Sequence, residues 1–239
     1  VGWDTLVNRY PIDETGTNHD WLKPGPDGAS AWAPLQLEYI WQRGATPYIQ
    51  LSVDDLRGLA SGAFDARVDA MLDAFAQFTS AGDGRRLILD ILPGANDRYF
   101  SYGDDPGRFK TAFTNVAAAA RAALGDDVRI AYTAKRTMRS NRYSPIDHGL
   151  GGYGLWWPGS AHVDLAGIYE YSDSGIGVYE DGIAELAETV GPAVPLFVSL
   201  SGRASSPTEA AQMAFIEDLV GFTASHPQMV GVQWHDADY

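Results

Sequence analysis

The sequence predicts an α/β fold built from repeated strand–helix units, and three observations support this prediction. From about residue 46 onward, short runs rich in β-branched or aromatic residues alternate with helical periods, as in βα units around a parallel sheet. The length of 239 residues fits one α/β barrel, which typically takes about 250 residues. Apolar residues make up 45% of the chain and aromatic residues 12%, as in a packed globular protein. We therefore expect a single domain over residues 1–239.

The predicted strands are short runs that are apolar enough to be buried in a parallel sheet. Residues 1–7 fit a first strand, and an eighth strand either lies within residues 8–22 or precedes Val1. These elements predict a (β/α)8 TIM barrel whose first strand is missing or irregular. The six clearest strands are residues 46–52, 86–92, 128–133, 163–169, 195–200 and 229–234.

Apolar residues recur at helical spacing between these strands, as the outer helices of a barrel require. Residues 32–41 predict a helix that Gly44 ends, and residues 206–209 predict a helix start with Pro207 in its first turn. Three stripes are expected to face the core: Val68, Met71, Leu72, Phe75 and Phe78; then Phe109, Phe113, Val116 and Ala120; and finally Met213, Ile216, Leu219, Val220 and Thr223.

Charge and composition exclude several classes of function. The 31 acidic and 17 basic residues give a formal charge of −14, which repels phosphate backbones and predicts no nucleic-acid partner. No run approaches the roughly 20 apolar residues of a membrane span, so no membrane insertion is expected. The chain has no cysteine and therefore no disulfide or thiolate site, which leaves the redox compartment open. Because it opens on Val1 rather than Met, we expect a processed form or a segment of a longer chain.

The sequence contains no motif for a metal or a cofactor, and we predict neither. The five histidines show no i, i+4 pairing and no HExxH motif, and no glycine-rich phosphate loop or nucleophile elbow is present. Residues 235–238 (HDAD) form the one local cluster, which we interpret as a hydrogen-bonded loop.

Three segments carry a family resemblance. Residues 59–65 read LASGAFD, residues 96–103 read NDRYFSYG, and residues 157–171 read WPGSAHVDLAGIYEY. They resemble the motifs I-x-x-G-x-[YF]-D, the tail of H-E-M-N-G-x-W-[YF], and Y-P-G-D-x-x-V-D-W-[VI]-G-x-D-x-Y of the family 26 glycoside hydrolases, (β/α)8 enzymes that include endo-β-mannanases. The similarity runs from about Gly44 to the C-terminus, and the order and spacing of the segments favour the same fold. A shared fold does not by itself imply a shared function.

The same resemblance implies that both catalytic glutamates are missing. The acid/base position of H-E-M-N falls on Gly94, with Pro93 in place of the histidine, and the nucleophile of P-x-x-x-x-E-x-G falls on Leu200. Retaining hydrolysis needs two carboxyl groups about 5.5 Å apart, and neither Gly nor Leu supplies one. Deliberate inactivation is a weaker explanation, because Pro93 departs from the pattern as well.

Other carboxylates follow predicted strands. Asp97 and Glu170 are the candidate catalytic residues of a relocated acid/base pair; alternatively Asp97 caps a loop, and Glu170 is solvated or lies in a salt bridge. Asp90 lies inside a strand and should point into the barrel, where Lys135 or Arg136 is the expected ion-pair partner. The full set near strand ends is Asp54, Asp55, Asp97, Glu170, Asp236 and Asp238.

Aromatic and polar residues at the same face predict a sugar-binding site. Pyranose rings present apolar C–H faces to aromatic rings, and their hydroxyls need positioned polar groups. Trp156 and Trp157 either join such a site or plug the barrel mouth. The predicted substrate-binding residues are Gln50, Asn96, Arg98, Tyr99, Tyr169, Tyr171 and Trp234.

Three functional hypotheses follow. The first is a catalytically degenerate glycosidase-like barrel for glycan recognition, or for a structural role in an extracellular or cell-surface assembly. Its partner is a glycan or oligosaccharide, or other parts of a larger chain. The second is an active glycoside hydrolase that uses relocated carboxylates on a β-linked polysaccharide. The third is a structural barrel whose mouth is filled by side chains such as Leu200 and Trp157.

Overall fold

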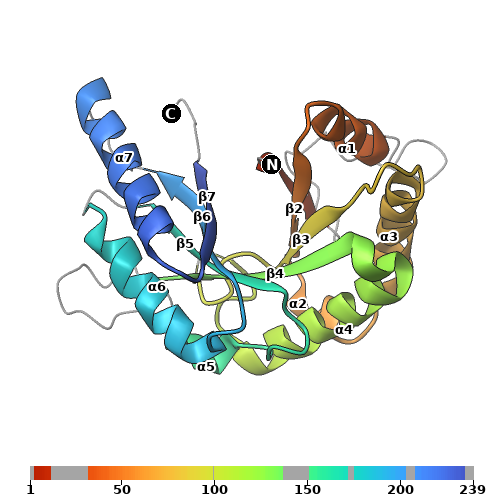
Figure 1. The fold of residues 1–239 in the computed structure, drawn as a ribbon. Coiled ribbons are helices and arrows are strands. Elements are labelled where there is room, and N and C mark those ends of the chain that lie inside the picture. Colours follow the sequence, from red (N-terminus) through yellow and green to blue (C-terminus); the bar gives the residue numbers. More distant parts are fainter. Residues whose placement is uncertain are drawn as a thin grey trace.

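The computed structural model of the chain describes residues 3–11, 32–98, 100–136, 151–171, 175–202 and 208–234. Within these residues, seven parallel strands pair in chain order from β1 to β7, and the sheet curls into an arc (Figure 1). The strands are β1 (Trp3–Pro11), β2 (Thr46–Ser52), β3 (Leu87–Ile91), β4 (Val128–Lys135), β5 (Leu165–Tyr171), β6 (Leu196–Gly202) and β7 (Met229–Trp234).

Helices alternate with the strands and lie on the outer, convex side of the arc (Figure 1). This arrangement confirms the predicted α/β class and is that of a partial (β/α)8 barrel. None of the described helices has the length and apolar character needed to cross a bilayer. The helices are α1 (Trp32–Gln42), α2 (Leu56–Ala60), α3 (Asp65–Thr79), α4 (Pro106–Leu124), α5 (Tyr153–Trp156), α6 (Gly177–Val190) and α7 (Glu209–Ser225), with a 3-10 turn, η2 (Gly125–Asp127), after α4.

The strand predictions agree closely with the structure, and the first strand is the one that differs most. β1 extends to Pro11, beyond the predicted residues 1–7, and its register with β2 shifts between Leu6 and Arg9. This irregularity matches the expectation of an irregular first strand. The described part of the chain contains no eighth strand, and residues 12–22 lie outside it.

Local signals account for the helix boundaries. α1 ends at Gln42, and Gly44 follows with φ +77, a left-handed conformation that glycine adopts without steric cost. The Asp105 side chain caps α4 by accepting a hydrogen bond from the Arg108 N–H. Thr208 caps α7 in the same way, so the helix begins at Glu209, within the predicted start at residues 206–209, but position 207 precedes the cap and is not in the first turn as predicted.

The predicted core stripes are confirmed for α3 and α4, whereas in α7 Leu219 is buried as predicted and two other predicted residues are exposed. Met213 and Val220 of α7 are 50% and 52% exposed, whereas Phe215 and Leu219 are buried. Phe215 packs against Tyr179 of α6, with 5.7 Å between ring centroids. α7 is apolar or small on most of its surface, so residue spacing alone fits more than one face, and the position of α6 selects the buried one.

Side chains on the concave face of the sheet form layers. Tyr48, Ile88, Ala131, Leu165 and Phe197 make an apolar cluster separate from the main core between sheet and helices. Successive residues of a strand point to opposite faces, so the residue two positions later lies on the same face, one layer nearer the carboxyl ends. That second layer is polar or small: Gln50, Asp90, Thr133, Gly167 and Ser199.

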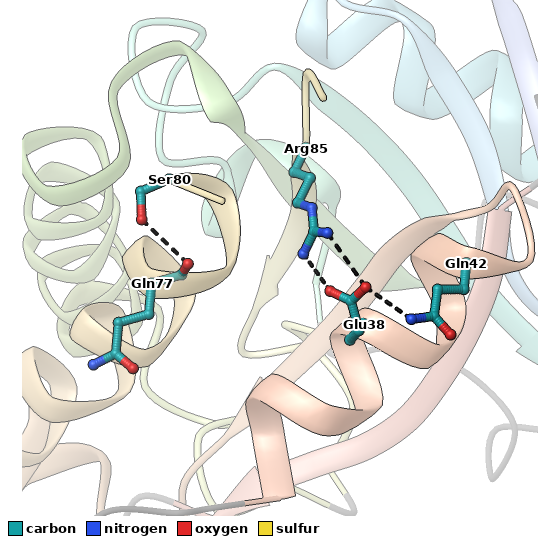
Figure 2. A network of polar contacts seen from close by, with 5 residues as sticks. All are labelled: Glu38, Gln42, Gln77, Ser80 and Arg85. Carbon is teal, nitrogen blue, oxygen red and sulfur yellow. Dashed lines mark hydrogen bonds and ion pairs between the residues drawn. The ribbon is translucent and has the colours of Figure 1, made fainter. Parts of the chain in front are cut away.

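An ion pair ties α1 to the beginning of β3, at the opposite end of the strands. Figure 2 shows the Arg85 guanidinium against the Glu38 carboxylate, with Gln42 Nε2 donating to Glu38 Oε1 over 2.9 Å. The Gln42 hydrogen bond, followed by that of Arg85, lowers the pKa of Glu38. The Arg85 guanidinium also lies 5.3 Å from the Phe78 ring centroid. This network supports the scaffold rather than the site at the carboxyl ends.

Candidate functional site

A fully buried carboxylate, Asp90, lies in the second layer of the concave face. Tyr48 Oη donates to its Oδ2 over 2.7 Å, and Thr133 Oγ1 donates over 3.0 Å. Gln50 Nε2 lies 3.4 Å from the same oxygen, and Tyr48 Oη also lies 3.3 Å from Ser199 Oγ. Four strands therefore converge on one polar network, and the prediction that Asp90 points into the barrel is confirmed.

Burial dominates the ionisation of this network. Desolvation raises the pKa of Asp90 from its ordinary 3.8 to about 7, although the hydrogen bonds from Tyr48, Thr133 and Gln50 work in the opposite direction. Desolvation also raises the pKa of Tyr48. Asp90 is fully enclosed by neighbouring side chains and lies one layer below the carboxyl-end edge of the sheet.

The predicted ion pair between Asp90 and Lys135 or Arg136 is wrong. Lys135 Nζ lies 3.3 Å from Asp97 Oδ2, and an Arg136 guanidinium nitrogen lies 3.6 Å from Glu170 Oε1. Asp97 and Glu170 stand at the same carboxyl-end edge as the two cations and pair with them. Asp90, one layer deeper, is held by neutral donors instead.

The two candidate catalytic carboxylates, Asp97 and Glu170, are buried and held by different cations. Arg136, the partner of Glu170, packs beside α6: a Cβ added to Gly182 would lie 3.5 Å from Arg136 Cγ. Tyr179 Oη of α6 also donates to the Glu170 carbonyl over 2.9 Å. Glu170 thus lies in a salt bridge next to α6, as one of the two alternatives for it expected.

The loop after β3 is built around Gly94, the position that the resemblance assigns to the acid/base. Gly94 has φ +71, and its N–H donates to Thr133 Oγ1 over 3.1 Å, which links the loop to the Asp90 network. A Cβ on Gly94 would lie 2.9 Å from Phe100 Cε2. Tyr102 Oη donates to the Pro93 carbonyl over 2.7 Å and closes the loop on its other side. Both the left-handed backbone and the Phe100 ring therefore disfavour a side chain at this position.

Aromatic rings gather beside this loop. Phe100 stacks on Tyr102 with centroids 5.0 Å apart and an interplanar angle of 8°. The edge of Tyr169, from β5, meets Phe100 at 6.3 Å and 69°. Phe100 and Tyr169 are both half-buried, whereas Tyr102 is fully enclosed. Phe100 and Tyr169 thus form one continuous aromatic wall next to Gly94.

Asn96 supplies a polar group at the same place. Its Oδ1 accepts a hydrogen bond from the Lys135 N–H over 2.7 Å. Its Nδ2 is buried and has no hydrogen-bond partner among the described residues. An amide donor without a partner is costly inside a protein.

The remaining predicted binding residues fall into three groups. Gln50 is buried and engaged by Asp90, and Arg98 is exposed just after the Gly94 loop. Tyr171 and Trp234 end β5 and β7, at the expected edge of the sheet. Predicted residues or side chains that lie outside the described part of the chain are Tyr99, Asp236 and Asp238, and the side chains of Tyr171, Leu200 and Trp234.

Trp156 and Trp157 neither join the candidate site nor plug the mouth of the barrel. The Trp156 ring lies 5.6 Å from Phe109 of α4, and Trp157 lies 5.2 Å from Tyr132. Both contacts belong to the core between sheet and helices. The earlier expectation is wrong because the short helix α5 places these rings against the outer side of the sheet.

The strand-end residue Asp55 and possible metal-binding groups are further candidates for a site. The Asp55 side chain accepts a hydrogen bond from the Gly58 N–H over 2.9 Å and caps α2. No group of three or more His, Asp or Glu side chains that could hold a metal ion is found in the described part of the chain.

The contact of Phe100 with Gly94 and the donors Tyr48 and Thr133 around Asp90 were not predicted from the sequence. Thr133 could have been found from strand alternation, since it lies two residues after Ala131, the register partner of Asp90. The position of Phe100 depends on how the loop after β3 folds back, and no sequence signal specifies it.

The fold is a partial (β/α)8 barrel similar to that of family 26 glycoside hydrolases. A double mutant of the endo-beta-1,4-mannanase of Cellulomonas fimi matches with a TM-score of 0.61 at 18% identity, over 87% of this chain and 52% of that one. GH26C from Muricauda sp. MAR_2010_75 matches with a TM-score of 0.65 at 12% identity, over 90% of this chain and 67% of that one.

A GH39 beta-xylosidase from Caulobacter crescentus also matches, with a TM-score of 0.60 at 14% identity, over 90% of this chain and 52% of that one. The chain spans about half the length of the Cellulomonas fimi protein (52%). No family model matches the sequence, and no curated protein matches it either. At these identities the likeness shows the fold alone.

Proposed function

We propose that this chain is a glycan-binding barrel of the family 26 type in which hydrolysis by two glutamates has been lost. The observation that carries the proposal is the loop at Gly94. The position that the resemblance assigns to the acid/base is a glycine with a left-handed backbone and the Phe100 ring against it, so a glutamate there would strain the backbone and displace the ring. The second catalytic position is Leu200 of β6.

The fold supports a carbohydrate ligand, since several structurally similar proteins are named as enzymes of β-linked glycans. The site supports it as well, because a half-buried aromatic wall and the Asn96 amide stand at the carboxyl ends of the strands, where barrels bind their ligands. A location outside the cell or on its surface is part of this proposal, because polysaccharide ligands are found there.

Relocated carboxylates are the competing explanation, and Asp97 and Glu170 are the residues to test. Each is buried against a cation, and Glu170 lies next to α6. A glycosidase needs both groups at one scissile bond. Their separate ion pairs favour the binding role over hydrolysis.

The test combines binding and turnover in one experiment. Manno-oligosaccharides and β-gluco-oligosaccharides are titrated by calorimetry, and new reducing ends are then measured after long incubation. Saturable binding without cleavage is the expected result. Cleavage that is abolished by Asp97→Asn or Glu170→Gln would overturn the proposal and support the relocated pair. If the protein neither binds nor cleaves these oligosaccharides, a structural role is favoured.

A further inference from the structure

We propose that Phe100 and Tyr169 form the wall on which a neutral pyranose ring stacks, at the position where a family 26 enzyme would carry its acid/base. The proposal rests on the proposed glycan-binding function and deepens it, since it assigns the residues that hold the sugar and the class of sugar that they accept.

The first step concerns the space over Gly94. The nearest side-chain atom to a hypothetical Cβ there is Phe100 Cε2, at 2.9 Å, so the ring occupies the volume that a side chain at position 94 would need. Tyr102 lies parallel to Phe100 on one side and is itself held by the Pro93 carbonyl. Phe100 is therefore fixed in place before any ligand binds, which lowers the entropic cost of stacking.

The second step concerns Tyr169. It lies two residues after Gly167 on β5 and so shares the concave face with the Asp90 layer. In the motif that residues 157–171 resemble, this position is an aspartate, so an aromatic ring replaces an acidic group here. Tyr169 meets Phe100 edge to face, and both rings keep part of their surface exposed. The apolar C–H face of a pyranose fits such a surface.

The third step concerns polarity and charge. The only buried amide nitrogen of the described asparagine and glutamine side chains that lacks a hydrogen-bond partner is Asn96 Nδ2, and Asn96 is bonded to the Lys135 backbone beside Tyr169. Lys135 Nζ faces Asp97. With a net charge of −14, the protein repels acidic sugars. The site is thus suited to the hydroxyls of uncharged hexoses and not to uronates.

The test compares matched aromatic variants by calorimetry with mannohexaose, cellohexaose and an oligomannuronate of the same length. Phe100→Ala and Tyr169→Ala are expected to weaken binding of the preferred neutral oligosaccharide by about tenfold or more. Tyr169→Phe should bind nearly as well as the wild type, because the ring is retained. Tyr39→Ala is the control, since Tyr39 is an exposed ring on α1.

Phe100→Leu separates folding from stacking, because leucine keeps apolar volume but offers no aromatic face. It should fold as the wild type does, judged by circular dichroism, and still lose affinity. Saturation-transfer NMR provides a second measurement. In the wild type, the C–H protons of the sugar ring should receive strong saturation transfer from the protein, and this transfer should fall in Phe100→Leu.

Each outcome has a distinct meaning. If the wild type binds and all of these variants bind as tightly, the stacking wall is wrong while the glycan-binding function stands. Losses confined to Tyr171→Ala and Trp234→Ala would then place the wall at β5 and β7. Tighter binding of the oligomannuronate would overturn the neutral class. If the wild type binds none of the three, the proposed function itself fails.

Discussion

At the scale of single residues, the surroundings of a buried side chain determine its ionisation. Asp90 is the main example: this interior carboxylate is held by the hydroxyls of Tyr48 and Thr133, and within the described part of the chain no cation pairs with it. Such a group favours its protonated form, because burial penalises the charge and neutral donors compensate only in part. The ionisation of Asp90 therefore couples the stability of the fold to pH.

We predict that Asp90→Asn removes a pH-dependent loss of stability. The pKa of Asp90 is about 7 in the folded state and near 3.8 when the chain is unfolded. Between these values the folded state binds more protons, so stability should fall as pH rises from about 4 to about 7, by at most about 1.4 kcal/mol per pH unit. Above pH 7 the variant should be the more stable protein.

Urea unfolding of wild type and Asp90→Asn across pH 4 to 8 measures this difference directly. Asp73→Asn, at an exposed position of α3, is the control for the loss of one negative charge. Parallel pH profiles for the wild type and Asp90→Asn would contradict the prediction.

Gly94 provides a second prediction at the residue scale. Gly94→Ala should be destabilised both by the left-handed backbone, about 1–2 kcal/mol, and by contact with Phe100, about 1 kcal/mol or more. Gly44→Ala is a matched control, because Gly44 has φ +77 and nothing within 4 Å of a new Cβ. Chemical denaturation should show a larger loss for Gly94→Ala, and Phe100→Ala should remove the excess. Equal losses at both glycines would mean that Phe100 does not restrict position 94.

At the scale of elements, a glycine on β5 makes room for a large side chain on β6. Gly167 faces Phe197 across the sheet, and a Cβ on Gly167 would lie 2.7 Å from the Phe197 ring. Phe197 belongs to the apolar layer that fills the concave face below the polar network. The absence of a side chain on β5 is thus what allows the large ring on β6.

We predict that Gly167→Ala destabilises the fold by about 1–3 kcal/mol, because it overpacks this layer. Phe197→Leu should relieve the clash, so the double variant should be more stable than the sum of the single changes implies. Urea unfolding of the four proteins gives the coupling energy. Additive effects would show that the two strands adjust independently.

Helices differ in how much of their packing the sequence specifies. The stripes of α3 and α4 are clear because their large apolar residues lie on one face while the other face carries polar residues or alanine, and those predictions are confirmed. In α7 the apolar residues Met213 and Val220 lie on the exposed side, and the choice of face depends on Phe215 meeting Tyr179 of α6. In a helix with apolar residues on several faces, the neighbouring helix determines which face is buried.

For the whole molecule, the unbroken order of seven parallel strands predicts one cooperative unit. Thermal or urea unfolding followed by circular dichroism and by tryptophan fluorescence should give coincident transitions. Two separate transitions would instead mark a domain boundary within residues 1–239. This measurement tests the expectation of a single domain.

The sequence by itself determined the alternation of strands and helices, the class of fold and the carboxyl-end edge on which the candidate residues fall. Those features depend on local periodicity and on the rule that parallel strands end at one edge, both of which can be read along the chain. The partners of each side chain were decided by the tertiary structure. Asp90 is paired with hydroxyls from other strands, Lys135 is drawn to Asp97, and Phe100 folds back onto Gly94. These contacts join residues from different strands and loops, so only the curvature and register of the sheet bring them together.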